Sequence, residues 1–235
     1  MPMYRRVNET FFDRWSPEMA YVLGFIFADG YVHTNKRGSA YLGFVSTDLE
    51  ILKKIKKVMD SDHVITLRKR SNMKLAWKDL WRLQIGNKHI FSKLHQFGIF
   101  QNKSLTIAMP TIPQNMLGHF VRGYFDGDGN VYFNKLKVKD RKNPKWIFSS
   151  RFISGSRNFL LKLQKALSGY TNGGFIVVKR KGEIISGYEL CYSHRDSLAL
   201  YRLMYNNAVA SKLFLERKHR LFTRAVTTLY GNMRA

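Results

Sequence analysis

The sequence predicts an α+β protein of two related halves, each with the element order helix, strand, strand, helix, strand, strand, helix. Residues 22–30 and 121–129 support this, because both are apolar runs with small residues four apart that end in Asp-Gly. The segments after each motif match in the same order, as an internal duplication requires. Two prolines between the halves argue against a helix across the boundary. We therefore expect an N-terminal half of residues 1–109, a linker of residues 110–113 and a C-terminal half of residues 114–235.

The elements after each motif helix follow from periodicity and capping. A first hairpin of two strands is followed, in residues 45–55 and 153–163, by a strand end, a polar cap and an amphipathic helix. Extra residues around 137–145 predict a longer first hairpin in the second half, because insertions are tolerated at hairpin tips. Residues 211–229 are expected to form one further helix. The remaining matches are strands 64–70 with 175–181 and 80–85 with 187–192, and helices near 88–97 and 194–206.

Each motif helix carries two small residues one helical turn apart. These are Gly24 and Ala28 on the first helix, and Gly123 and Gly127 on the second. Small residues at this spacing let two helix backbones approach closely, whereas a glycine inside a helix costs about 1 kcal/mol relative to alanine. The alternative is an ordinary core helix with incidental glycines. Because the pattern occurs twice, we predict that these four residues form an interface between the motif helices.

An aspartate ends each motif helix, Asp29 in the first copy and Asp128 in the second. The C-terminal end of a helix is negative and disfavours an anion, and two such carboxylates brought together repel each other. A bound divalent cation is the simplest way to offset both effects. The motifs therefore predict a metal site that the two aspartates share. The alternative is that they only cap their helices.

The charge of the chain predicts a polyanionic partner. Lys and Arg number 40 against 16 acidic residues, a net charge of +24, and a hydrophobic fraction of 45% excludes a disordered chain. Nucleic acid fits this excess better than an anionic membrane surface, and no apolar run approaches the roughly 20 residues of a membrane span.

The single cysteine, Cys191, excludes an intrachain disulfide and is expected to be a half-buried strand residue. Without a signal-peptide core, we expect an intracellular protein in a genome-containing compartment (cytoplasm, nucleoid or organelle), not a secreted one.

The paired motifs and the matching elements after them resemble the single-chain LAGLIDADG homing endonucleases, over residues 16–229. The resemblance implies that the motif helices form the interface between two αββαββα halves. It also implies that each half contributes a four-stranded antiparallel sheet with helices on one face, and that the two sheets form a saddle over double-stranded DNA. Because both motif copies lie in one chain, a monomer is expected.

The same resemblance implies the catalytic centre. Asp29 and Asp128 occupy the last acidic position of each motif, so they are expected to be catalytic. They are also expected to bind the metal, together with Ala28 and Gly127. Mg²⁺ is the expected cofactor, and Mn²⁺ or Ca²⁺ can substitute in the site. Asp126 occupies a motif position that is apolar in the first copy, and we interpret it as a structural residue.

Family members also keep basic residues near the metal. Lys103 and Lys212 hold matching places after the third helix of each half and are the candidates, with contact to a DNA phosphate as their alternative role. The family often places a polar residue at the end of the second strand, where this chain has Thr47 and Gly155. Since glycine has no side chain, we do not expect the two halves to order water in the same way.

Side chains two residues apart on a strand share one face of a sheet, and a two-stranded ribbon fits the DNA major groove. There, Arg and Lys suit guanine, and Asn and Gln suit adenine. The alternative for each single residue is a phosphate contact or a solvated side chain. The residues expected to bind DNA are Tyr31, His33, Asn35, Arg37, Arg68, Arg70, Arg82 and Gln84 in the first half, and Tyr132, Asn134, Lys135, Lys137, Lys139, Arg141, Arg151, Lys179, Lys181, Tyr188 and Tyr192 in the second.

The resemblance thus implies a homing endonuclease that hydrolyses phosphodiesters on both strands of a long DNA site with Mg²⁺ and leaves short 3′ overhangs. The site is expected to be asymmetric, because a fused pseudo-dimer is not tied to a palindrome as a homodimer is. One alternative is an RNA-binding maturase that assists the splicing of intron RNA on the same scaffold. Another is a DNA-binding regulator without catalysis, against which the presence of both motif acids argues.

Overall fold

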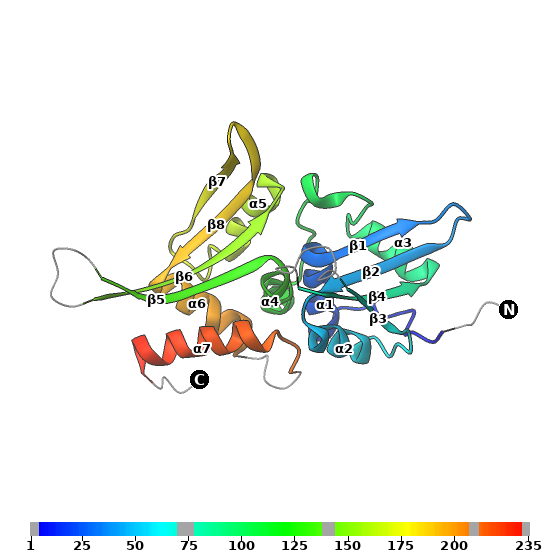
Figure 1. Ribbon diagram of the computed structural model, residues 1–235, viewed down its shortest axis with the longest axis horizontal. Coiled ribbons are helices and arrows are strands. Elements are labelled where there is room, and N and C mark those ends of the chain that lie inside the picture. Colours follow the sequence, from blue (N-terminus) through cyan, green and yellow to red (C-terminus); the bar gives the residue numbers. More distant parts are fainter. Residues whose placement is uncertain (1–4, 70–77, 138–143, 207–211, 232–235) are drawn as a thin grey trace. The chain divides into compact units, whose positions relative to one another are not determined.

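The computed structural model describes residues 5–69, 78–137, 144–206 and 212–231 (Figure 1). Their contacts divide the chain into two compact units. The first contains the described residues up to Lys103 together with Pro110–Tyr124, and the second contains Ser104–Met109 together with the described residues from Phe125 onwards. The predicted linker therefore lies in the first unit, and so does the first part of the second motif helix.

The first unit is built around a four-stranded sheet. Its elements are α1 (Pro17–Asp29), β1 (Gly30–Thr34), β2 (Ala40–Ser46), α2 (Leu49–Val58), β3 (Ile65–Arg68), β4 (Leu80–Gly86), α3 (Lys88–Gln96) and the 3-10 helix η2 (Gln114–Met116). The strands are antiparallel, in the order β1-β2-β4-β3. The register places Gly43 of β2 beside both Tyr31 of β1 and Gln84 of β4.

The second unit repeats this arrangement. Its elements are the end of α4 (Leu117–Asp128), β5 (Gly129–Leu136), β6 (Lys145–Ser154), α5 (Arg157–Leu167), β7 (Phe175–Lys181), β8 (Ile184–Ser193), α6 (His194–Tyr205) and α7 (Glu216–Tyr230), and the 3-10 helix η1 (Lys103–Leu105) lies where the chain passes between the units. The strand order is β5-β6-β8-β7, again antiparallel.

The two sheets have the same order of strands after their motif helix, so the predicted α+β fold of two αββαββα halves is confirmed. The longer first hairpin of the second half is confirmed too, since β5 and β6 have 8 and 10 residues where β1 and β2 have 5 and 7. The further helix expected near the C-terminus is α7. No helix in the described part of the chain is both long and apolar enough to cross a bilayer.

Polar residues cap α1, α2, α3 and α5. The hydroxyl of Ser16 accepts a hydrogen bond from the backbone N–H of Met19 at 3.1 Å and caps α1. Ser156 caps α5 in the same way, with the N–H of Phe159 at 3.3 Å. These caps fix where each helix leaves the preceding segment.

One face of each sheet is buried against helices, and the other is exposed. In the first unit, Leu42 of β2 and Leu83 of β4 are buried on the side of α2 and α3. In the second unit, Phe152 of β6 and Leu190 of β8 are buried on the side of α5 and α6. Because side chains alternate along a strand, the neighbouring residues point to the opposite face. Among the predicted DNA-binding side chains, that face carries Tyr31, Arg82 and Gln84 in the first unit and Tyr132 and Arg151 in the second.

The motif helices approach closely within the first unit. A Cβ added to Gly24 of α1 would overlap the carbonyl oxygen of Phe120 on α4. A Cβ added to Gly123 of α4 would overlap the carbonyl oxygen of Tyr21 on α1. The contact is reciprocal, since each glycine meets the backbone of the other helix. The predicted interface is confirmed for these two glycines and stays a prediction for Ala28 and Gly127.

A buried cation lies beside this helix contact. Arg122 is 1% exposed, its guanidinium carbon lies 5.3 Å from the ring centroid of Tyr21, and its Nη2 lies 3.1 Å from Nδ1 of His119. Burial, and then the charge of Arg122, lower the pKa of His119. Because arginine can only donate, Nδ1 of the neutral imidazole accepts this hydrogen bond.

Candidate catalytic centre and nucleic-acid interface

Asp29 is the last residue of α1, and its side chain is exposed. The last carbonyl groups of a helix have no partner within the helix and form its negative end. Lys103 lies against them, since its side chain is buried and its Nζ donates to the carbonyl oxygen of Phe27 at 3.4 Å. A buried ammonium group thus stands at the helix end that presents the motif carboxylate.

Asp128 is the last residue of α4 and is half-buried. Here Lys218 of α7 is the buried cation, and its Nζ donates to the carbonyl oxygens of Phe125 at 2.7 Å, Asp126 at 2.7 Å and Gly127 at 3.1 Å. These three bonds match the three donors of an ammonium group. Lys218 therefore fixes the last turn of the second motif helix from a different element.

Asp126 holds the same junction. It is 2% exposed, and its Oδ2 accepts a hydrogen bond from the backbone N–H of Leu215 at 2.8 Å, at the N-cap of α7. The interpretation of Asp126 as a structural residue agrees with this contact. With Lys218, it ties the start of α7 to the end of α4.

Lys212 does not occupy a place like that of Lys103, which corrects the predicted correspondence. Lys212 is exposed and has a φ of 48°, a left-handed conformation that Asn102, with a φ of 61°, shares. By backbone conformation Lys212 thus matches Asn102, and by contact Lys218 matches Lys103. The sequence does carry a signal for Lys218, because it precedes the buried Phe222 by one helical turn and so lies on the apolar stripe of α7.

The carboxylate at each motif end is a type of ligand that suits a divalent cation such as Mg²⁺. Mg²⁺ is bound by one or two carboxylates, with water and substrate oxygens completing the shell. Asp29 and Asp128 are hard oxygen ligands that are not fully buried, and the described residues contain no cluster of three or more His, Cys, Asp or Glu. The carbonyl of Gly127 already accepts from Lys218, so only its second lone pair remains for a metal. The buried lysines also offset part of the negative charge at the helix ends, so a metal is not needed to offset all of it.

The exposed face of the first sheet carries the predicted set Tyr31, His33, Arg68, Arg82 and Gln84, which the register places on one side. Arg82 connects two strands, since its Nε donates to the hydroxyl of Tyr31 at 2.7 Å and its Nη2 donates to Oε1 of Gln84. The ring of His33 stacks on that of Tyr31, with centroids 5.8 Å apart. The sheet therefore presents an ordered polar and aromatic surface.

The hairpin between β1 and β2 uses Asn35 internally. Its Oδ1 accepts from the backbone N–H groups of Arg37 and Ser39, at 3.0 and 2.9 Å, and its Nδ2 donates to the hydroxyl of Tyr41 at 3.4 Å. The expectation that Asn35 binds a base is thus weakened, because the amide holds the turn. Arg37 is exposed in this turn, and Arg70 lies outside the described residues.

The second sheet presents a different set on its corresponding face. Tyr132 and Asn134 of β5 share this face with Arg151 of β6. Nη1 of Arg151 lies 3.3 Å from a carboxylate oxygen of Glu189 on β8, and Nζ of Lys179 on β7 lies 3.4 Å from the other oxygen. Glu189 therefore orients both basic side chains, although it is not among the predicted site residues. Lys181 is exposed at the end of β7.

The two tyrosines of β8 that were predicted to contact DNA, Tyr188 and Tyr192, lie on the core side of the sheet. Tyr192 is 1% exposed and packs edge-on against Phe152, and burial raises its pKa to about 12. It shares the core side of the strand with Leu190, so it does not lie on the exposed face of the sheet. Tyr188 has the same parity and is half-buried. Glu189 and Cys191 of β8 lie on the side of Arg151 instead, and both are buried, so Cys191 is more buried than the sequence predicts.

Lys135 is also on the other side of its sheet. It pairs with Trp146, on the face opposite Tyr132 and Asn134, and its Nζ lies 4.8 Å from the Trp146 ring centroid. The predicted row of lysines therefore does not continue the surface of Arg151. Lys137 is exposed beyond the end of β5, and Lys139 and Arg141 lie outside the described residues.

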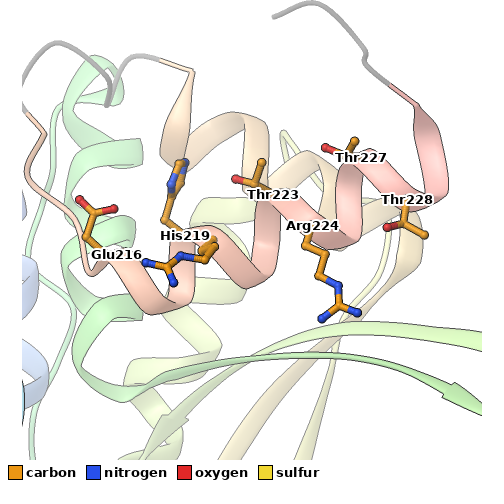
Figure 2. Close-up of a pocket in the computed structure, with 7 residues that line it drawn as sticks. Glu216, His219, Thr223, Arg224, Thr227 and Thr228 are labelled. Atoms are coloured by element: carbon orange, nitrogen blue, oxygen red, sulfur yellow. The ribbon is translucent and has the colours of Figure 1, made fainter.

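Thr47 and Gly155 lie where the sequence predicts, each directly after the second strand of its half. An open depression runs along α7, and Figure 2 shows its side chains spread from Glu216 in the first turn to Thr228 in the last. One helix supplies its whole lining, with Glu216, His219, Arg220, Thr223, Arg224, Thr227 and Thr228.

Comparison with known proteins agrees with this architecture. Residues 16–100 match the family model described as a LAGLIDADG-like domain. No match was found among curated proteins. The fold and the motif ends define a protein of the two-motif LAGLIDADG homing-endonuclease fold.

Solved structures of this fold cover nearly the whole chain. Meganuclease I-SmaMI bound to uncleavable DNA has a TM-score of 0.62 at 13% identity over 92% of each chain. LAGLIDADG meganuclease I-AabMI bound to uncleaved DNA has a TM-score of 0.60 at 13% identity, over 91% of this chain and 90% of its own. The homing endonuclease I-WcaI bound to its DNA recognition sequence has a TM-score of 0.57 at 16% identity over 91% of each chain.

Proposed function

We propose that this protein is a sequence-specific, metal-dependent endonuclease that hydrolyses both strands of double-stranded DNA. One repeated arrangement carries the proposal: a motif helix ends in an aspartate beside a buried lysine, and a sheet with an exposed polar face follows directly. The net charge of +24 suits a polyanionic substrate. One structure of similar fold shows I-SmaMI bound to cleaved DNA.

Asp29 and Asp128 are the residues that we propose to hold the cation, one from each half. We expect Mg²⁺, with Mn²⁺ or Ca²⁺ able to occupy the site, and I-SmaMI has been solved with uncleaved DNA in the presence of calcium ions. When bound, the cation lowers the pKa of a water molecule and offsets charge on the phosphate. Lys103 places positive charge at the end of α1, where it can offset the negative charge that develops on a nearby phosphate. Lys218 positions Asp128 by fixing the last turn of α4.

The exposed faces of the two sheets are the proposed DNA-binding surfaces. They present different side chains at matching positions, so the target is proposed to be a long asymmetric site. Cleavage of both strands with short 3′ overhangs is the expected product. We expect the protein to act as a monomer in a genome-containing compartment of the cell, because one chain supplies both halves.

The test is incubation of the protein and Mg²⁺ with a randomised DNA library, followed by sequencing of cut ends. Asp29→Asn and Asp128→Asn should each abolish double-strand cleavage of the selected target and leave its affinity nearly unchanged, because the amide keeps the shape but loses the charge. Asp62→Asn, at an exposed aspartate, is the matched control and should cut at the wild-type rate. Linearisation at the wild-type rate by either motif variant would remove that carboxylate from the mechanism. Binding of intron RNA without cleavage of any DNA would favour the maturase alternative.

A further inference from the structure

The exposed face of the first sheet holds one arginine in a fixed direction. Arg82 donates from Nε to the hydroxyl of Tyr31 at 2.7 Å and from Nη2 to Oε1 of Gln84, and its guanidinium carbon lies 5.8 Å from the Tyr31 ring centroid. All three side chains are half-buried. A side chain that is already ordered loses less conformational freedom on binding. Arg82 is therefore prepared to contact a ligand in a single geometry.

Tyr31 reaches Arg82 because the strand between them carries a glycine. β2 lies between β1 and β4, and Gly43 is the residue of β2 beside both Tyr31 and Gln84. A Cβ added to Gly43 would overlap the ring of Tyr31. The ring thus lies flat across β2 and brings its hydroxyl to β4. Any side chain at position 43 would displace it.

The same network determines which hydrogen-bonding groups remain for a ligand. Arginine has donors only, so the Gln84 atom that faces it must be the oxygen. Because Arg82 engages one lone pair of that oxygen, only the second remains, and the two Nε2 donors are the part of Gln84 that is fully open to a ligand. Since Tyr31 occupies Nε of Arg82, the terminal nitrogens are left, and they also donate. The open hydrogen-bonding groups of Arg82 and Gln84 are therefore mainly donors.

Guanine is the base that offers two acceptors, N7 and O6, in the major groove, whereas adenine and cytosine each present a donor there. We propose that Arg82 recognises a guanine in the DNA target, and that Tyr31, Gly43 and Gln84 are positioning residues that make this preference stringent. The free donors of Gln84 favour guanine or thymine over adenine at the neighbouring base pair. The inference rests on the proposed function, because it names the base specificity of the same DNA-binding surface.

The test is selection by binding from a randomised duplex library in Ca²⁺, with wild type and three variants. Arg82→Ala should lose the guanine preference at one position of the target. Tyr31→Phe keeps the ring over Gly43 but removes the acceptor, and it should weaken the same preference roughly tenfold. Gly43→Ala should do likewise by displacing the ring. The rest of the profile should stay unchanged in all three.

Gly169→Ala is the control, because its added Cβ meets no atom within 4 Å, and it should give the wild-type profile. Retention of every guanine preference by Arg82→Ala would overturn the inference. A loss confined to a position where wild type prefers another base would do the same, and an unchanged profile for Tyr31→Phe would overturn the positioning role. A wild-type protein that enriches no sequence would overturn the proposed function itself, so the two failures are distinct.

Discussion

Two glycines set the distance between the motif helices in the first unit. We expect Gly24→Ala to destabilise the protein by about 1–3 kcal/mol, because the added Cβ would overlap the Phe120 carbonyl, which is backbone and cannot swing aside. Helix propensity alone would give the opposite sign, since alanine is favoured over glycine by about 1 kcal/mol inside a helix. Urea denaturation of Gly24→Ala measures the difference, with Gly169→Ala as the control. A rise in the free energy of unfolding would contradict the close contact.

These glycines could be predicted from sequence because their spacing recurs in two copies. The direction of single strand residues could not be, because a register error of one residue moves a side chain to the opposite face. Tyr192 and Lys135 show this, since each lies on the core side of its sheet. Glu189 could not be predicted as a site residue, because an acidic side chain does not suit DNA by itself. Its role depends on the two basic side chains that it orients.

The end of α4 depends on a helix that lies far along the chain. Lys218→Met should lower the free energy of unfolding by about 1–3 kcal/mol, because it leaves buried carbonyl oxygens of α4 without their charged donor. Methionine keeps much of the apolar length, so the loss reports mainly the hydrogen bonds. The matched control is Lys212→Met, at an exposed lysine, which should leave the free energy unchanged. Equal losses for both variants would restore the correspondence of Lys212 with Lys103.

The order of elements was predictable from the repeat, but the contact of Lys218 with the end of α4 was not. Which lysine reaches the helix end depends on how α7 packs against α4, and that contact joins segments about ninety residues apart. The matching strands also differ in what they present. Where the first sheet has Gly43 with Arg82 held by Tyr31, the second has Arg151 held by Glu189. Each half therefore orders an arginine, but from a different strand and with a different partner.

The charge of the whole molecule governs how it should bind DNA. With a net charge of +24, contacts to 6–10 phosphates would lower affinity for duplex DNA by about 10³-fold or more between 50 and 200 mM salt. Filter binding or fluorescence anisotropy across this range measures the slope of log K against log salt. A flat dependence would contradict a DNA-binding function, because counterion release accompanies every contact to a phosphate.

The slope of log K against log salt also distinguishes a side chain that contacts a phosphate from one that contacts a base. A lysine that contacts a phosphate reduces the slope by about one when it is replaced, whereas a base contact lowers affinity for the target and leaves the slope nearly unchanged. We expect Lys181→Met, at an exposed lysine of β7, to behave in the first way and Arg82→Ala in the second. On an unrelated duplex, Arg82→Ala should bind almost as wild type does, because the guanidinium of Arg82 adds affinity only where it contacts the preferred base. A reduced slope for Arg82→Ala would instead place this arginine on the backbone.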